Sequence, residues 1–251
     1  ARQGVLDNYL EKMQGLLLDR GLRESSEGSE VRSVARAITT TAIKELGAER
    51  NALLINYLQE SDLIQKDADS TEPTDSESAP QRSGIKLLRE LNLFEASLTR
   101  AYFQAADLSD AGLLSANLTF DNLTFANLTF ANLREADLIA AILSNANLSN
   151  ANLSEVDLTF ANLASADMNG AVLNSALLRS ANLTDANLTD ANLHRADLSF
   201  ANLSGAKLRE VNLRGADLSR VRNLPEDQLK DTVLCATKLP EEFAVDPNRD
   251  C

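Results

Sequence analysis

Apolar residues of two sizes alternate at a fixed spacing through the second half of the chain. A leucine stands at every fifth residue from Leu93 to Leu218, which gives 26 copies, and only two centres depart from leucine, Phe103 and Met168. From Leu98 on, an alanine stands two positions before each centre, with three exceptions, Asp121, Val156 and Val211. So regular a repeat predicts a solenoid in which each unit buries its apolar residues against its neighbours.

The five-residue period excludes regular helices and continuous strands. On an α-helix five residues advance about 500°, so successive leucines would not share a face. On one continuous strand an odd spacing would place successive leucines on opposite faces. We therefore expect short extended pieces separated by corners, with the alanine and the leucine pointing inward. The Asn or Asp that commonly lies between them suits such a backbone, because its side chain bonds to nearby backbone groups.

Repeats such as Ala-Asn-Leu-Thr-Phe at residues 126–130 and Ala-Asp-Leu-Ser-Phe at residues 196–200 resemble those of the pentapeptide-repeat family. The resemblance implies a mainly β fold, a right-handed quadrilateral β-helix (the Rfr fold), with four five-residue sides in each coil. Residues 85–220 would then form about six and a half coils, stacked into a rod about 30 Å long. Side chains that are four repeats apart would stack along this rod.

Apolar residues recur at helical spacing in three segments, 6–17, 31–46 and 53–58, which predicts an α-helical domain over residues 1–64. Ser29 is a candidate N-cap for the second helix, and Gly47 is expected to end it. The region resembles the helical region before the repeats in cyanobacterial pentapeptide-repeat proteins. Two interpretations stay open: a cap on the first coil, or a bundle for self-association or partner binding.

Two further segments differ in composition from the repeats. Residues 65–84 are acidic and lack large apolar side chains, so they are predicted to form a flexible linker. After Val221 the five-residue spacing of leucines resumes one position out of phase, so the coil is predicted to end there. Residues 221–251 would form a C-terminal cap, with Pro225 at the start of a short helix. Such a cap would cover the unpaired edges of the last coil.

The formal net charge of −13 argues against direct binding to nucleic acid or anionic lipid, both of which attract basic proteins. No run of 18 apolar residues occurs, so we expect no membrane span in this chain. Transmembrane helices lie further upstream in many of the resembling proteins, so a membrane anchor before Ala1 stays open. The compartment stays open too, with the cytoplasm slightly favoured over the thylakoid lumen or periplasm for a chain that is soluble as given.

Candidate catalytic chemistry is sparse. His194 is the single histidine, follows a repeat centre and is expected to point outward. No Ser/His/Asp or Cys/His arrangement can be assembled from one histidine and two late cysteines. We therefore assign no catalytic, cofactor-binding or metal-binding residue and expect that the protein is not an enzyme.

Five phenylalanines stand two residues after a repeat centre and are predicted to point outward: Phe120, Phe125, Phe130, Phe160 and Phe200. With four repeats in each coil, Phe120, Phe160 and Phe200 would share one face at every second coil. Exposed aromatic side chains in register can mark a contact surface. The alternative is that they shield the backbone of the corners from water.

The two cysteines, Cys235 and Cys251, lie close together near the C-terminus. A disulfide between them would close a loop of about 16 residues and add about 3 kcal/mol to stability. Some pentapeptide-repeat proteins of oxidising compartments resemble the chain in having a disulfide near the C-terminal cap. Two unpaired thiols in a reducing compartment remain the alternative.

These features favour a non-enzymatic scaffold, a rigid rod that presents its outer faces and ends to an unidentified protein partner. The family resemblance also implies an alternative, DNA mimicry that modulates a type II topoisomerase such as gyrase. Mimicry requires a concentrated negative surface, whereas residues 85–220 hold 15 acidic and 10 basic residues, a net charge of −5. The remaining −8 lies in the linker and the two ends.

Overall fold

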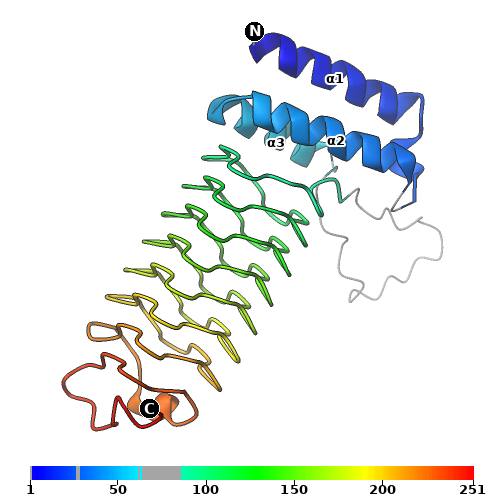
Figure 1. Ribbon diagram of the computed structural model, residues 1–251. Helices are drawn as coiled ribbons and strands as arrows, with labels where there is room; N and C mark the ends of the chain where they lie inside the picture. The colour runs from blue at the N-terminus through cyan, green and yellow to red at the C-terminus, as the bar shows by residue number, and fades with distance from the viewer. Residues whose placement is uncertain (1, 27–28, 62, 64–85) are drawn as a thin grey trace, which may run out of the picture.

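The computed structural model describes residues 2–26, 29–61, 63 and 86–251. Three helices lie at one end, a rod of stacked coils follows, and the C-terminal segment folds over the far end (Figure 1). The predicted linker at 65–84 lies outside the described residues.

The coils of the rod return to the same face after every fourth sequence unit. Parallel bridges join each outward residue at the middle of a side to its counterpart in the next coil, from Asn92 with Gly112 to Asn202 with Arg222. Because the members of each pair are separated by four of the five-residue units, a coil has four sides. Each side chain therefore stands directly above or below its counterparts in the adjacent coils.

Hydrogen bonding explains why Asn or Asp recurs in the repeat. In repeat 161–165, the alanine N–H bonds across the preceding turn to the Leu158 carbonyl at 3.0 Å. The N–H groups of Asn162, Leu163 and Ser165 reach neighbouring coils at 2.9, 2.8 and 2.8 Å. The fifth, that of Ala164, reaches the Oδ1 atom of Asn162 at 3.2 Å. The Asn side chain thus satisfies the one backbone donor that no neighbouring coil accepts from.

The corners of the rod require a left-handed backbone. Every fifth residue from Glu90 to Gly215 has a φ between 53° and 68°, at the third position of a four-residue turn, as in a type II β-turn. Only three of these 26 positions carry glycine: Gly170, Gly205 and Gly215. At every other corner a residue with a side chain adopts the left-handed backbone conformation, which costs about 1 kcal/mol. Stacking of the coils must offset this cost.

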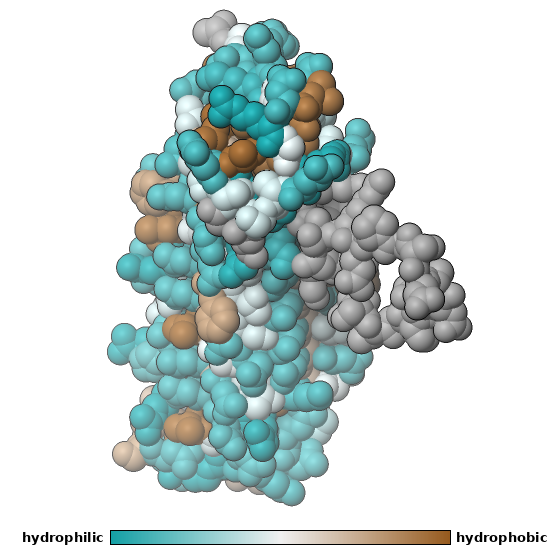
Figure 2. All heavy atoms as spheres, turned by 90° about the vertical axis from the view of Figure 1, so that its right-hand side faces the viewer, coloured by the Kyte–Doolittle hydropathy of each residue, from teal (hydrophilic) through white to brown (hydrophobic). Residues whose placement is uncertain are grey.

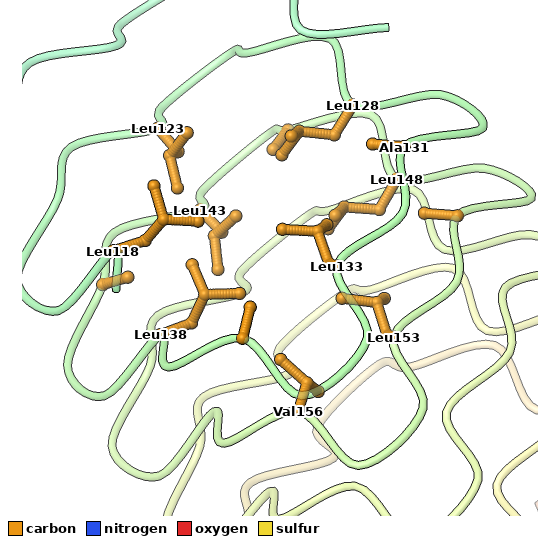
Figure 3. Packing of buried hydrophobic residues seen from close by; sticks show 14 of the residues in the cluster. Leu118, Leu123, Leu128, Ala131, Leu133, Leu138, Leu143, Leu148, Leu153 and Val156 are labelled. Atoms are coloured by element: carbon orange, nitrogen blue, oxygen red, sulfur yellow. The ribbon is translucent and has the colours of Figure 1, made fainter. Parts of the chain in front are cut away.

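The core consists of the inward alanines and leucines. Figure 3 shows leucines of successive coils, such as Leu118 with Leu138 and Leu128 with Leu148, pointing into the centre of the rod. These side chains are at most 1% exposed. The residues that replace alanine or leucine in the pattern, such as Phe103 and Asp121, are also fully buried. Because side chains fill the interior, contacts with other molecules fall to the outer faces, the corners and the ends.

The three predicted helices are confirmed. Helix α1 spans Arg2–Leu18, α2 spans Glu30–Glu45 and α3 spans Ala48–Glu60, with a short 3-10 helix, η1, at Leu22–Glu24. Ser29 is the N-cap of α2, as predicted, and its hydroxyl accepts a bond from the Arg32 N–H at 3.4 Å. Helix α1 packs on α2, where the buried Tyr9 and Thr39 hydroxyl groups lie 3.0 Å apart.

Helix α3 covers the first coil. The buried Asn51 amide group donates to the carbonyls of Ile43 and Leu46, at 2.9 and 3.4 Å, and to Ser97 of the first coil at 2.7 Å. Further along α3, Gln59 donates to the Gln104 carbonyl at 2.8 Å. Helix side chains thus satisfy coil carbonyls that have no preceding coil to bond to, which is the capping role considered for this region.

Replacing Asn51 with alanine should lower the free energy of unfolding by about 2 kcal/mol, because buried carbonyls at the junction lose their donor. Urea unfolding followed by circular dichroism measures the loss. Asn56→Ala is the matched control, since Asn56 is exposed on the same helix and the substitution changes helix propensity equally. Equal stabilities of the two variants would contradict a clamping role for Asn51.

The coil continues beyond the predicted end, which corrects that interpretation of the sequence. Asn212 bridges Val233 and Asp217 bridges Lys238, and each partner lies one residue further along the chain than in the preceding coils. The extra residue lies between Arg222, which still pairs in register with Asn202, and Leu224, just before a 3-10 helix, η2, at Glu226–Leu229 with Pro225 as its N-cap. Three leucines of the shifted phase remain buried: Leu224, Leu229 and Leu234. The change of phase is therefore a one-residue insertion in a coil whose ladder continues.

The C-terminal residues fold over this last coil. Cys235 and Cys251 form a disulfide, which is one of the two alternatives that the sequence left open. The Asp250 N–H donates to the Leu234 carbonyl at 2.9 Å, and its carboxylate accepts from the Leu234 N–H at 2.8 Å. Arg249 donates to the Leu229 carbonyl at 3.1 Å. The chain end is therefore tied to the edge of the rod by covalent and hydrogen bonds.

Candidate contact surface on the rod

All five predicted phenylalanines point outward at the left-handed corner position. Their exposed fractions are 53, 54, 62, 65 and 40% for Phe120, Phe125, Phe130, Phe160 and Phe200. Each has a φ near 60°. Because most of its surface stays in water, such an exposed apolar side chain contributes little to the stability of the fold.

The rod brings three of these phenylalanines into one corner column. The column comprises Arg100, Phe120, Ala140, Phe160, Ser180, Phe200 and Arg220, all but Arg220 with a positive φ, and we call it the apolar edge. Phe125 and Phe130 lie on two other corners and do not join it. Because adjacent coils are about 4.8 Å apart, successive phenylalanines on the edge are about 10 Å apart.

The two ends of the apolar edge carry arginines that cover their neighbouring rings. The Arg100 guanidinium lies 5.7 Å from the centre of the Phe120 ring, and the Arg220 guanidinium lies 5.3 Å from that of Phe200. Both distances are typical of cation–π contacts. Phe160, in the middle, is the most exposed of the five phenylalanines.

Apolar side chains on the adjoining faces fill the intervals between the phenylalanines. Ile142 stands in the coil of Ala140 and Leu177 in that of Ser180, and they are 42 and 41% exposed. Five consecutive coils therefore present a large apolar side chain at or beside this corner. The corner column carries no carboxylate, whereas each of the other three corners carries at least one. Figure 2 shows apolar residues standing out at several heights of a mostly hydrophilic surface.

Asp121 lies inside the core, next to the apolar edge. Its Oδ1 atom accepts a bond from the Ala101 N–H at 2.7 Å, whereas its Oδ2 atom is buried without a hydrogen-bond partner. Burial raises the pKa of this carboxyl from 3.8 to about 8, against the lowering effect of the backbone donors. The sequence signalled the residue only as an Asp in place of an alanine, and its burial followed from the structure.

The other candidate residues take ordinary positions. His194 is half-buried in a turn, where its backbone N–H donates to Asn192 Oδ1 at 3.2 Å. Across the described ranges, no three His, Cys, Asp or Glu side chains group in a way that could hold a metal ion. None of the described helices is both long and apolar enough to cross a membrane.

The four-sided coils and the filled interior define a β-helical solenoid protein. The sequence profile described as pentapeptide repeats (8 copies) matches residues 122–159, 157–195 and 186–222. The chain belongs to the pentapeptide-repeat family, whose members form right-handed β-helices and are generally non-enzymatic structural or interaction proteins.

Solved structures of similar proteins include cyanobacterial ones. HetL of Nostoc sp. strain PCC 7120, involved in heterocyst differentiation regulation, is 30% identical over 61% of this chain and 90% of its own, with a TM-score of 0.31. The protein alr5209 of Nostoc PCC 7120 is 31% identical over 45% and 84%, with a TM-score of 0.31. Rfr23 of Cyanothece 51142 is 36% identical over 47% and 63%, with a TM-score of 0.23. Curated proteins yield no match.

Proposed function

We propose that the protein is a non-enzymatic scaffold, a rigid rod that binds a protein partner along its apolar edge. The observation that carries the proposal is the run of large apolar side chains at or beside one corner over five consecutive coils, centred on Phe160. Exposed apolar side chains that gather on one part of a surface often mark a site that binds another protein. The partner's chemistry follows from the surface: apolar side chains at its centre, with acidic groups placed to meet Arg100 and Arg220.

The rest of the rod forms a rigid frame for the apolar edge. Backbone N–H groups bond between adjacent coils throughout the rod, and both ends are covered, one by α3 and the other by the disulfide-bound tail. Side chains on such a frame keep a fixed spacing, so a partner can bind without ordering them first.

Replacing Phe160 and Phe200 with serine should abolish partner capture and leave the fold intact, because Ser165, Ser175 and Ser180 already occupy equivalent corner positions. The measurement is photo-crosslinking in the source organism, with benzoylphenylalanine at Phe120 as the reporter. The expected result is a discrete adduct in the parent protein that disappears in the double variant.

Phe125→Ser with Phe130→Ser is the matched control, since it removes two exposed rings of similar total area from two other corners. The control should retain the adduct. Loss of the adduct in both double variants, or in neither, would contradict a specific role for the apolar edge. Melting temperatures of both variants should stay within a few degrees of the parent.

A second candidate, modulation of a type II topoisomerase by DNA mimicry, is supported by a column of acidic residues on one face: Asp137, Asp157, Asp197 and Asp217. Cations offset part of this charge, because Arg179 lies 3.6 Å from Asp197 and Lys238 lies 2.8 Å from Asp217. We rank this function second for that reason. Unchanged supercoiling by gyrase in the presence of excess protein would eliminate it.

The proposal has two further parts. One is self-association through the helices, and the other is the compartment in which the protein lies. The exposed apolar residues Leu18 and Leu53, on α1 and α3, are the candidates for a helix-mediated contact between two copies. The disulfide favours an oxidising compartment, such as a periplasm or thylakoid lumen, over the cytoplasm.

A further inference from the structure

Gly112 is a glycine that the local backbone does not require. It occupies the outward position at the middle of a side and bridges Asn92 in one adjacent coil and Asn132 in the other. Its φ is not among the positive values. A Cβ atom added to it would meet its nearest neighbours, the Asn92 Cα atom and the Leu91 carbonyl, at 3.7 Å, an ordinary contact. A glycine inside a strand often marks a bulge, a tight bend, or a place where a ligand or another backbone approaches closely.

The missing side chain leaves a hollow of about 420 Å³ on this face. Gly112 forms its floor, between the side chains of Asn92 and Asn132. The volume falls in the range of sites that hold a small ligand or a single long side chain. The hollow lies away from the apolar edge, so the inference does not depend on the proposed function.

The missing side chain also leaves a backbone donor without its usual acceptor. Above and below the hollow, Asn92 Oδ1 accepts from the Phe94 N–H at 3.1 Å and Asn132 Oδ1 accepts from the Arg134 N–H at 3.3 Å. The equivalent N–H at the hollow belongs to Leu114, and it has no acceptor among the described residues. An occupant with a carbonyl oxygen would supply what the asparagine supplies in other repeats.

The two walls of the hollow differ in chemistry. Phe94, which is 42% exposed, and Leu114 form an apolar wall at one corner. Glu90 and Asp110 form the opposite wall. Arg89 lies 3.7 Å from Glu90 and 3.6 Å from Asp110, and Arg36 lies 3.9 Å from Glu90, so both carboxylates have cationic neighbours at distances longer than a hydrogen bond.

We propose that this hollow binds an arginine or lysine residue of a partner protein. The apolar stem packs on Phe94 and Leu114, the cationic head bonds to Glu90 and Asp110, and the residue's peptide carbonyl accepts from the Leu114 N–H. Long cationic side chains combine an apolar stem with a charged head in this way, and an exposed aromatic face attracts a guanidinium. The chain's net charge of −13 favours a basic partner at a site lined by two carboxylates.

The test is a titration of the full chain with Nα-acetyl-arginine N-methylamide, followed by the backbone amide signals in ¹⁵N NMR spectra. Saturable shifts are expected at Gly112, Leu114 and the neighbouring residues, with a dissociation constant in the millimolar range. The citrulline analogue, which is nearly isosteric but uncharged, should bind at least ten-fold more weakly. Absence of saturable shifts, or equal binding of the citrulline analogue, would overturn the proposal.

Two variants at the same kind of position sharpen this test. Gly112→Asn restores the usual repeat residue, fills the hollow and supplies the missing acceptor, so binding should be lost while the melting temperature is unchanged or higher. Val172→Asn makes the equivalent change three coils away on the same face and should leave binding within two-fold of the parent. If Gly112→Asn does not fold, Asp110→Asn serves instead and should weaken arginine binding about ten-fold without affecting the citrulline analogue. Parent-like binding in the variant that is used would overturn the proposal.

Discussion

Replacing Asp121 with alanine should raise the free energy of unfolding by about 3 kcal/mol at pH 7 and by little in acid. The folded protein holds this carboxyl protonated, with its pKa raised to about 8 by burial, whereas the unfolded chain ionises it near 3.8. Keeping it neutral at pH 7 costs the fold about 4 kcal/mol. Losing the bond from the Ala101 N–H costs about 1 kcal/mol, and that N–H keeps its bond to the Leu98 carbonyl at 3.0 Å.

The pH dependence distinguishes this cause from simple repacking. A raised carboxyl pKa means that the folded state holds more protons than the unfolded state between about pH 4 and pH 8, so the parent protein loses stability as pH rises through that window. Urea unfolding at pH 4 and pH 8 should therefore show a difference between parent and variant that is within about 1 kcal/mol at pH 4 and several kcal/mol at pH 8.

Asp185→Asn is the control for net charge, because it removes a carboxylate from an exposed corner. Asparagine is tolerated at left-handed positions, so the control should not add backbone strain. A stability gain in Asp121→Ala that has the same size at pH 4 and pH 8 would show that the buried carboxyl is not protonated in the folded protein.

Breaking the disulfide by Cys251→Ser should lower the free energy of unfolding by about 3 kcal/mol, since the bond closes a loop of about 16 residues in the unfolded chain. The folded state also loses order at its end, because the disulfide holds Arg249 and Asp250 against the carbonyl and amide groups of the last coil. Thermal unfolding measures the resulting loss of stability.

A dithiol reductant provides the internal comparison for this prediction. It should lower the melting temperature of the parent to that of Cys251→Ser and leave the variant unchanged. A parent protein whose melting temperature does not respond to the reductant would contradict a stabilising role for the bond.

The sequence predicted the rod and its corners because the repeat period itself excludes the alternatives. Twenty-six centres at one spacing leave only a coil that buries all of them, and that pattern also placed Phe160 and its counterparts outside. The helices followed from apolar periodicity, and Ser29 from its capping chemistry. These features depend on local pattern, which the sequence displays directly.

Features that depend on contacts between distant residues did not follow from the sequence. In the sequence, Asn51 is one polar residue on an amphipathic helix. Its hydrogen bond to Ser97 can be predicted only when the packing of α3 on the first coil is known. In the sequence, Gly112 is one of several departures from the repeat. Only its φ and its neighbours show that the backbone there does not require glycine. The change of phase after Val221 was interpreted as an end, because the sequence does not distinguish one inserted residue from the end of a coil.

The four-repeat coil also governs how such a chain can change in length during evolution. An insertion or deletion of four whole repeats adds or removes one layer and leaves every later side chain on its original side of the rod. A change of one repeat preserves the buried leucine pattern equally well but turns everything after it by a quarter revolution. The apolar edge would then be divided between two corners, and the C-terminal tail would face another direction. Whole-coil steps are therefore the length changes that keep a binding edge continuous.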